Sequence, residues 1–402
     1  MKVLVADKFP DSAVDKIKKF GVEVIYEQNL KDDSLLDAMK EKQPNVVVVR
    51  STKVTGPMIQ ANPDLSLIIR AGAGFNTIDV GTASLRGVYV ANCPGKNAIA
   101  VAELAMGHIM SIDRRIPDCV IQLRDGKWDK AGFSKAEGIY GSTLGIIGTG
   151  RIGQEVIIRA KAFGMKVIAW SRSLTSEMAA ELGIERCASI TEVASRADYV
   201  SLHLALTDDT RGMIDSAFFG SMKAGAALIN TSRAEIVDQD ALLNALDNKG
   251  IRAGLDVFAD EPSYKEGEFV NRIAAHPSVF GTHHIGASTN QAQLAVAEES
   301  INIISTFLAT GLVLNCVNLI AKTPAKYVLS VRHRNRVGVL ADVLRIVREN
   351  EINVEKMENI IFAGAEGACA NIQIDDELSS IALDGLRRSS DDIYDVNLTR
   401  IE

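Results

Sequence analysis

The sequence predicts an α/β fold with two doubly wound, Rossmann-like parallel-sheet domains and a smaller ferredoxin-like βαββαβ module. Short β-branched runs alternate with helical segments from residue 2 onward, which is typical of parallel sheets. A glycine-rich turn then separates a strand from a helix near residue 148. After a linker, the remaining residues indicate a strand, a helix, two strands, a helix and a last strand.

The length of 402 residues suggests two or three domains, because one domain usually holds roughly 150 residues. The chain is 47% apolar and 24% charged, and no apolar run reaches the roughly 18 residues that a membrane span requires. We therefore expect a soluble protein. The formal charge of −7 disfavours nucleic acids and anionic membranes as partners, although it still allows a local basic pocket for a small anion.

The N-terminal residues and the cysteines indicate a cytoplasmic protein. The opening MKVLVADKFP predicts a short strand rather than an export signal. Five cysteines lack the close spacing of zinc sites or redox motifs, and such usage is typical of a reducing compartment: Cys93, Cys119, Cys187, Cys316 and Cys369. We predict no metal site.

The first domain is predicted to be discontinuous. Helices that begin near Ser12 and Ser34 alternate with the strands KVLVAD, VEVIYE, NVVVVR and LSLIIRAG. A long helix over residues 290–310 follows the second domain and would return the chain to the first. We therefore predict a flavodoxin-like substrate-binding domain over residues 1–97 and 287–322.

The second domain is predicted to be a dinucleotide-binding Rossmann domain over residues 98–286. It begins with an apolar helix over residues 98–112 and continues to the strand, turn and helix of STLGIIGTGRIGQEV. Further strands are indicated in KVIAWS, ADYVSLHL, AALINTS, AGLDVF and SVFGTHH. The linker TPAKYV then opens the third segment, residues 323–402.

The pattern GxGxxG at Gly148, Gly150 and Gly153 predicts a dinucleotide site, because it directly follows a strand and opens a helix. Gly148 permits the tight turn, Gly150 lets a pyrophosphate approach the backbone, and Gly153 allows the helix to pack closely. The amides of Arg151 and Ile152 would meet the phosphates at the helix N-terminus.

The end of the next strand leaves the choice between NAD and NADP open. An NAD site normally has Asp or Glu there to bind the ribose hydroxyls, whereas here Trp170 is followed by Ser171 and Arg172. Arg172 could bind the 2′-phosphate of NADP. It could equally lie in solvent or stack on adenine while NAD binds.

Three motifs at the C-terminal ends of later strands predict a catalytic centre: INTSRAEIVD with Arg233, GLDVFADEP with Glu261, and GTHHIGAS with two histidines. Oxidation of a 2-hydroxy acid requires a base for the hydroxyl proton, a hydride acceptor and a cation for the carboxylate. Glu261 beside an imidazole would raise the pKa of that imidazole and fix its tautomer. Asp256 could accept a hydrogen bond from the nicotinamide carboxamide.

With these motifs, the chain resembles the D-isomer-specific 2-hydroxyacid dehydrogenases along essentially its whole length. The resemblance implies that Arg233, Glu261 and His284 form the catalytic set, with His284 as the acid/base because IleGly follows it. His283 stands where the family usually has proline, and we expect it to be an inert neighbour. The family often continues ArgGlyGly after the arginine, whereas this chain continues with Ala234.

The resemblance also implies positions for the cofactor and for the hinge between the first two domains. Asn97 and Val101, in NCPGKNAIAVAE, match the segment that borders substrate and nicotinamide in relatives. We also place His203 and Thr231, from the strands ADYVSLHL and AALINTS, in the cofactor site.

Two loops of the first domain are candidates for substrate binding. Glycines in RAGAGFNTID would free the backbone amides around Ala73 and Gly74 to bind a carboxylate. Arg50, Ser51 and Lys53, in VVVRSTKVT, could receive a phosphate, and the resemblance favours a phosphorylated 2-hydroxy acid as substrate. The alternative is that the two basic residues merely flank an edge strand.

The third segment resembles an ACT domain, with residues 335–340 as the turn that opens its first helix. Such modules commonly bind amino acids, and the resemblance implies L-serine as an effector. The segment could instead only join subunits, because sheet edges pair across dimers. We expect a homodimer or a homotetramer.

Two other functions remain open from the sequence. Ser171 and Arg172 would suit an NADP-dependent glyoxylate or hydroxypyruvate reductase. An NAD(H)-sensing corepressor is the alternative from a different class, although the complete catalytic set disfavours it.

Overall fold

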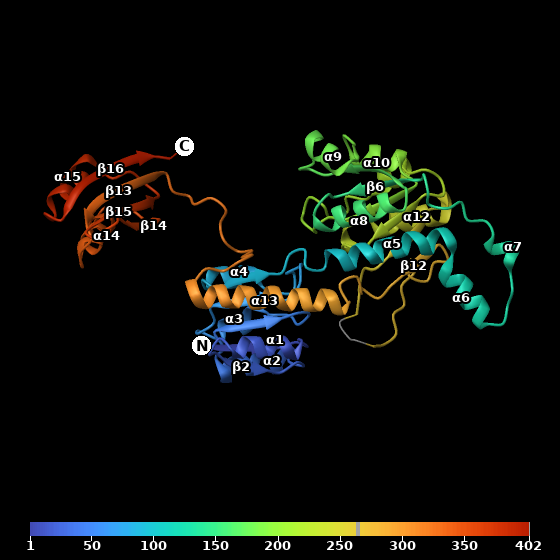
Figure 1. Ribbon diagram of the computed structural model, residues 1–402, viewed down its shortest axis with the longest axis horizontal. Coiled ribbons are helices and arrows are strands. Elements are labelled where there is room, and N and C mark those ends of the chain that lie inside the picture. The colour runs from blue at the N-terminus through green and yellow to red at the C-terminus, as the bar shows by residue number, and fades with distance from the viewer. Residues whose placement is uncertain (263–265, 402) are drawn as a thin grey trace. The chain divides into compact units, whose positions relative to one another are not determined.

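The computed structural model describes residues 1–262 and 266–401. The chain divides into two compact units, Met1–Asn318 and Leu319–Glu402. The first unit contains two parallel sheets and the second an antiparallel sheet (Figure 1). The predicted α/β class, with parallel Rossmann-like domains and a separate C-terminal region, is thereby confirmed.

The first sheet of the first unit has the strand order β2-β1-β3-β4-β5, with all strands parallel. Its strands are β1 Lys2–Val5, β2 Glu23–Tyr26, β3 Val46–Val49, β4 Leu67–Arg70 and β5 Tyr89–Asn92. The helices are α1 Asp11–Lys18, α2 Asp32–Lys42, α3 Gly56–Gln60 and α4 Val80–Leu85. Helix α13, Asn290–Thr310, also packs on this sheet through Val296 and Ile303. Helices cover both faces, so β3 is an unbroken run of four buried valines.

The second sheet has the order β12-β11-β10-β9-β6-β7-β8 and is also parallel. Its strands are β6 Thr143–Ile147, β7 Lys166–Trp170, β8 Glu185–Arg186, β9 Tyr199–Leu202, β10 Ala227–Asn230, β11 Arg252–Leu255 and β12 Val279–Gly281. After β8 the chain crosses to the other side of β6, so the strand order reverses between β6 and β9. Open parallel sheets bind ligands beyond the strand ends at such a point.

Helices α5 and α8 cover one face of the second sheet, and helices α10, α11 and α12 cover the other. The helices are α5 Ala98–Arg114, α8 Arg151–Ala162, α9 Ser176–Leu182, α10 Ile190–Arg196, α11 Ser216–Ser221 and α12 Gln239–Lys249, with the 3₁₀ turn η1 Ala234–Ile236. Two further helices, α6 Ile116–Arg124 and α7 Lys130–Phe133, contain no buried residue. Neither helix was predicted from the sequence.

The second unit has the element order βαββαβ that the sequence predicts. It consists of β13 Tyr327–Arg334, α14 Val339–Glu349, β14 Val354–Ile361, β15 Gly367–Ile374, α15 Ser380–Arg388 and β16 Ile393–Arg400. The antiparallel sheet has the order β14-β15-β13-β16. Alternate residues of β15 are buried under the two helices, as expected for a sheet that is covered on one side.

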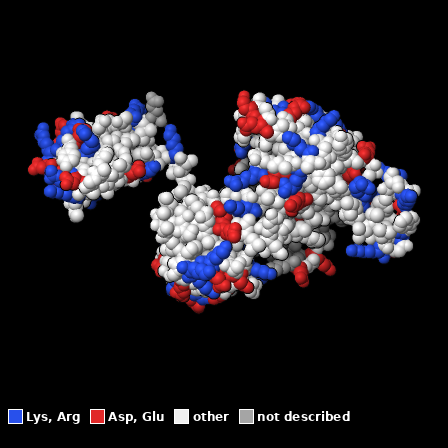
Figure 2. Space-filling model, viewed as in Figure 1, with Lys and Arg blue, Asp and Glu red and all other residues white. Residues whose placement is uncertain are grey.

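Basic and acidic side chains are interspersed over the face shown in Figure 2. None of the described helices combines the length and the apolar character needed to cross a lipid bilayer. The predicted helix ends are close to those observed: α13 has the predicted bounds, and α5 continues two residues beyond the predicted end to Arg114. The predicted division of the first unit at residues 97 and 286 stays a prediction.

Candidate active site

The turn after β6 has the shape that a dinucleotide phosphate site requires. Gly148 has a φ of 98°, and a Cβ there would press against the carbonyl of His203. A Cβ at Gly153 would overlap the carbonyl of Gly148, so close helix packing excludes larger residues. Around Gly150, in contrast, no atom lies within 4 Å of a Cβ position. Gly148 and Gly153 are thus required for close packing. Gly150 leaves free space in front of the N-terminus of α8, which begins at Arg151.

Two buried polar atoms at the ends of the neighbouring strands β9 and β10 lack hydrogen-bond partners among the described residues: Nδ1 of His203 and Oγ1 of Thr231. The other ring nitrogen of His203, Nε2, lies 2.9 Å from Oγ of Ser201. Burial lowers the pKa of His203 to about 4, so its ring is neutral at pH 7. Buried polar atoms are normally satisfied, and these two orphaned atoms therefore fit a polar ligand such as a dinucleotide.

At the end of β7, Arg172 already has a carboxylate partner. Its Nη1 lies 3.2 Å from Oδ2 of Asp209, and the two side chains are 68% and 78% exposed. A carboxylate at this position would compete with a 2′-phosphate for the guanidinium and repel it. Neighbouring Ser171 is partly buried. The Asp209 carboxylate therefore gives the end of β7 an acidic group of the kind that an NAD site has there, which the residues next to Arg172 in the sequence did not indicate.

The predicted contact between His284 and Glu261 is present. Nδ1 of His284 lies 2.7 Å from Oε2 of Glu261, while Oε1 of Glu261 accepts a hydrogen bond of 2.9 Å from the N–H of Phe258. The hydrogen bond to Glu261 raises the pKa of His284 despite partial burial. Burial raises the pKa of Glu261, but hydrogen bonds from His284 and Phe258 outweigh burial, so the net shift is downward. The His284 side chain is half exposed, so its Nε2 can face a substrate.

Asp256 holds the turn that carries His284. Its carboxylate is buried and accepts hydrogen bonds from the N–H of Ile285 at 2.8 Å, the N–H of Gly286 at 2.8 Å and Oγ1 of Thr282 at 2.6 Å. His284 itself has a φ of 53°, in the left-handed region. The predicted contact between Asp256 and a nicotinamide carboxamide is additional to these bonds and stays a prediction.

Arg233, which follows β10, lies against a loop of the first sheet. The side chain of Asn230 fixes the turn after β10, because its Nδ2 donates to the carbonyl of Arg233 at 2.9 Å and its Oδ1 accepts from the N–H of Ser232 at 3.0 Å. A Cβ at Gly74 would overlap the Arg233 guanidinium. The arginine therefore lies directly against the loop that follows β4, and its charge acts on His284.

Arg70 is a site residue that we did not predict. It ends β4, its Nε is buried without a partner, and a Cβ at Gly72 would overlap its guanidinium. Burial first, and then the charges of Arg233 and Arg50, lower the pKa of Arg70 to about 10, so it remains charged at pH 7. In the described part of the chain no Asp or Glu forms an ion pair with any of these three arginines. Arg70 is the first residue of RAGAGFNTID. The sequence feature that could have identified it as a site residue is a basic residue at the end of a buried strand.

The predicted substrate residues of the first sheet lie around this arginine cluster. Asp7 accepts hydrogen bonds from the N–H groups of Arg50 at 2.6 Å and Ser51 at 3.0 Å, which fixes the backbone, and Oγ of Ser51 also donates to Asp7 at 3.4 Å. Ser51 and Lys53 are exposed. No described group accepts a hydrogen bond from the N–H of Ala73 or Gly74.

Asn97 and Val101, which the resemblance places at a hinge, lie at the start of α5, and the hinge itself stays a prediction. Oδ1 of Asn97 is buried without a partner, whereas Val101 is buried and faces Gly286. His283 is exposed beside the acid/base pair. Within the described ranges, no three or more His, Cys, Asp or Glu side chains are grouped to hold a metal ion.

Residues 106–286 match the family model described as D-isomer specific 2-hydroxyacid dehydrogenase, NAD binding domain. This range contains the glycine turn and the residues Arg233, Glu261 and His284. Over these residues the chain is similar to the NAD-binding domain of the D-isomer specific 2-hydroxyacid dehydrogenases. The match covers the second sheet and most of its surrounding helices, from the middle of α5 onward.

Relatives of this dehydrogenase family resemble the chain over most of its length. The chain is 39% identical over 321 residues to the D-3-phosphoglycerate dehydrogenase of Methanocaldococcus jannaschii, covering 79% of this chain and 60% of that protein. The crystal structure of the TT0316 protein from Thermus thermophilus is 29% identical with a TM-score of 0.70, covering 79% of this chain and all of that one.

An NAD⁺-bound 3-phosphoglycerate dehydrogenase from Entamoeba histolytica is 27% identical with a TM-score of 0.66, covering 80% of this chain and 99% of that one. The chain spans about 60% of the length of the Methanocaldococcus relative.

Proposed function

We propose that the chain is a D-3-phosphoglycerate dehydrogenase, which oxidises 3-phospho-D-glycerate to 3-phosphohydroxypyruvate with NAD, or catalyses the reverse reduction, at the first step of L-serine biosynthesis. The observation that carries the proposal is the combination of the His284–Glu261 pair with a cluster of arginines that form no ion pair with a carboxylate among the described residues. Several relatives that carry this enzyme's name are 34–39% identical to the chain, which supports the same substrate.

The acid/base chemistry follows from the His284–Glu261 pair. When bound, NAD supplies a hydride acceptor at nicotinamide C4. As the C2 hydrogen of the substrate leaves as hydride, Nε2 of His284 takes the proton of the C2 hydroxyl, and the carbonyl forms. Glu261 accepts the Nδ1–H of His284 and stabilises the imidazolium that results. In the reduction His284 returns the proton.

The cations match a substrate with two anionic groups. Arg233 and the N–H groups of Ala73 and Gly74 would bind the carboxylate and polarise the C2 oxygen. Arg50, Ser51 and Lys53 would bind the phosphate. Arg70 would add positive charge near both the carboxylate and the phosphate, because the charges of Arg50 and Arg233 both lower its pKa.

The second unit supports the prediction of an ACT domain through its βαββαβ order. L-serine is the expected effector, and a purely structural role is the alternative. A thermal-shift titration of the full chain with L-serine, together with initial rates, separates the two roles. An unchanged melting temperature and unchanged rates would favour the structural role.

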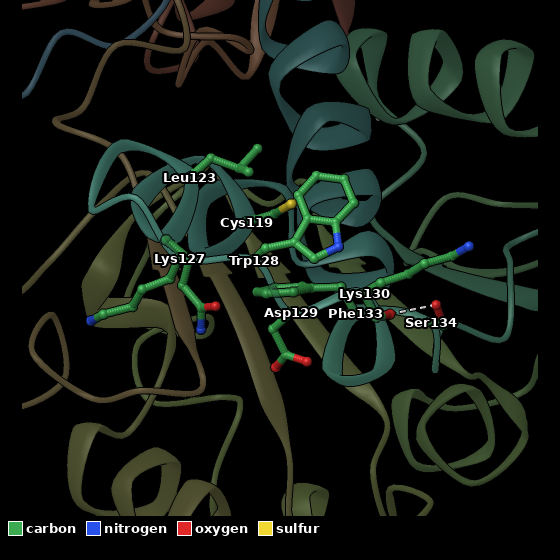
Figure 3. A pocket seen from close by; sticks show the side chains of 9 residues that line it. Cys119, Leu123, Lys127, Trp128, Asp129, Lys130, Phe133 and Ser134 are labelled. Carbon is green, nitrogen blue, oxygen red and sulfur yellow. Dashed lines mark hydrogen bonds between the residues drawn. The ribbon is translucent and has the colours of Figure 1, made fainter.

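The helices α6 and α7 support the prediction of a homo-oligomer. Short helices without buried residues are marginal in water, so a partner surface is needed to stabilise them. Trp128 is 81% exposed, and with Cys119 and Phe133 it lines a pocket of about 260 Å³ (Figure 3). Sedimentation analysis would identify a dimer or a tetramer, and a monomer would contradict the prediction.

An absorbance assay at 340 nm with phosphohydroxypyruvate, hydroxypyruvate and glyoxylate tests the function. We expect the highest kcat/KM for phosphohydroxypyruvate with NADH. A preference for glyoxylate or hydroxypyruvate with NADPH would instead identify an NADP-dependent glyoxylate or hydroxypyruvate reductase. Tight NADH binding without turnover of any of these acids would favour the sensing corepressor.

A further inference from the structure

A chain of buried polar side chains connects helix α5 to the turn that carries His284. His108 of α5 is only 3% exposed, and its Nε2 lies 3.3 Å from Oγ1 of Thr282. Oγ1 of Thr282 in turn lies 2.6 Å from Oδ1 of Asp256. Asp256 accepts the N–H groups of the two residues that follow His284. Neither His108 nor Thr282 contacts the acid/base pair directly.

The chemistry of these groups fixes the direction of each hydrogen bond. An ionised carboxylate only accepts, so the hydroxyl of Thr282 donates its proton to Asp256. The same oxygen can then accept from His108, whose Nε2 must carry the hydrogen. Burial lowers the pKa of His108, although the charge of Asp256 opposes this effect, and the ring is therefore neutral at pH 7.

The packing around His108 leaves little freedom for its ring. A Cβ at Gly254, in β11, would lie 2.6 Å from Cβ of His108, so helix and strand approach closely only because this residue is glycine. Helix α5 therefore fixes the position of the imidazole next to the C-terminal end of β11. Asp256 is the residue that directly follows this strand.

We propose that His108 and Thr282 are positioning residues that orient the Asp256 carboxylate and thereby hold the left-handed turn in which His284 meets Glu261. The inference deepens the proposed function, because it rests on His284 as the acid/base. A misplaced carboxylate would release the N–H groups of Ile285 and Gly286 and let the imidazole turn away.

Paired variants of each residue test the proposal in the full-length protein. Thr282→Ser retains the hydroxyl, whereas Thr282→Val has the same shape without it. His108→Gln can still donate a hydrogen bond, whereas His108→Leu cannot. We expect Thr282→Val and His108→Leu to lower kcat by roughly tenfold with KM changed by less than about twofold, and the Ser and Gln variants to remain near the wild type.

The titration of His284, followed by ¹⁵N-histidine NMR, is a readout that does not require turnover. Its midpoint should move in Thr282→Val but not in Thr282→Ser, and amide hydrogen exchange over residues 283–287 should become faster only in Thr282→Val. The proposal is overturned if the two Thr282 variants agree in kcat, in titration and in exchange. It is also overturned if Thr282→Val raises KM by the same factor by which it lowers kcat and also lowers the melting temperature, because this result would indicate a general structural role.

The same measurements separate this inference from the function on which it rests. If the wild type oxidises no 2-hydroxy acid, the proposed function fails. A His284 midpoint that differs between the two Thr282 variants would still support the hydrogen-bonded chain in that case, and identical midpoints would refute it.

Discussion

The charged residues at the ends of the two parallel sheets are organised in opposite ways. Beyond the first sheet, burial and the charge of Arg50 lower the pKa of Arg70, the carboxylate of Asp7 only partly offsets this effect, and neither arginine forms an ion pair among the described residues. Beyond the second sheet, His284, Glu261 and Asp256 each form short hydrogen bonds within the protein.

The difference indicates which charged groups a bound ligand would pair with and which are already oriented by partners within the protein. A partly buried cation without a partner destabilises the protein, so its retention indicates that an anion completes the site. The acid/base pair, in contrast, needs its pKa and orientation set before substrate arrives, and internal partners provide both. Substitutions on the two sides should therefore change different quantities.

The largest effect is expected for His284→Gln. Removal of a general acid/base typically lowers kcat by roughly 10²-fold to 10⁴-fold. Binding of NADH, measured by fluorescence, should stay within about twofold of the wild type, because Gln cannot transfer the proton but retains the shape of the turn. Retention of wild-type kcat would remove His284 from the mechanism.

Glu261→Gln should change the pH profile as well as the rate. Glu261 raises the pKa of His284, and oxidation requires the neutral imidazole, so the wild-type oxidation rate rises as pH increases through this elevated pKa. In the variant, the rise should move to lower pH, and the reduction rate should begin to fall at lower pH. We expect roughly a tenfold loss of kcat, measured over pH 5 to 10. An unshifted profile would show that Glu261 does not tune His284.

Arg70→Met should separate binding from stability. Arg70 is partly buried and forms no ion pair among the described residues, so its removal should stabilise the ligand-free protein by about 1–2 kcal/mol, measured by thermal unfolding. The same change should raise KM for the phosphorylated acid by roughly tenfold, because a charge-assisted contact is lost. Arg70→Lys is the matched control, which retains the charge. A less stable Arg70→Met protein with unchanged KM would indicate a structural role.

Arg50→Ala should be a smaller and more selective change. We expect KM for phosphohydroxypyruvate to rise roughly fivefold, and KM for hydroxypyruvate to stay nearly constant, because only the first substrate carries a phosphate. Equal increases for both substrates, in parallel initial-rate measurements, would contradict the phosphate contact.

The smallest effect is expected for Asp209→Asn, at the far end of the cofactor site. This change frees Arg172 from its exposed ion pair, and exposed pairs contribute only about 0–1 kcal/mol. The dissociation constant for NADP⁺, measured by calorimetry, should fall by roughly threefold, with that for NAD⁺ unchanged. The double variant with Arg172→Ala should cancel the gain, and a gain that persists would assign it to another residue.

Most of the site's parts could be predicted from the sequence because they are marked by local patterns. The glycine turn, Arg233, Glu261 and His284 each follow a strand whose apolar run is visible, and residues at such strand ends share one edge of a sheet. Arg70 follows the same rule but was overlooked, because the two glycines after it were assigned only to anion binding. Helices α6 and α7 were missed for a different reason, since their apolar residues do not face a core within this chain.

The sequence alone determined the strand and helix alternation, the βαββαβ order of the second unit and the chemical types at the strand ends, because hydrophobic period and turn residues act over a few positions. Only the tertiary structure decided which of these groups meet. The pairing of Arg172 with Asp209, the approach of Arg233 to Gly74 and the chain from His108 through Thr282 to Asp256 join residues between 26 and 174 positions apart or from different sheets. Such contacts depend on strand order and on helix packing, which result from burial of the whole core rather than from any short stretch.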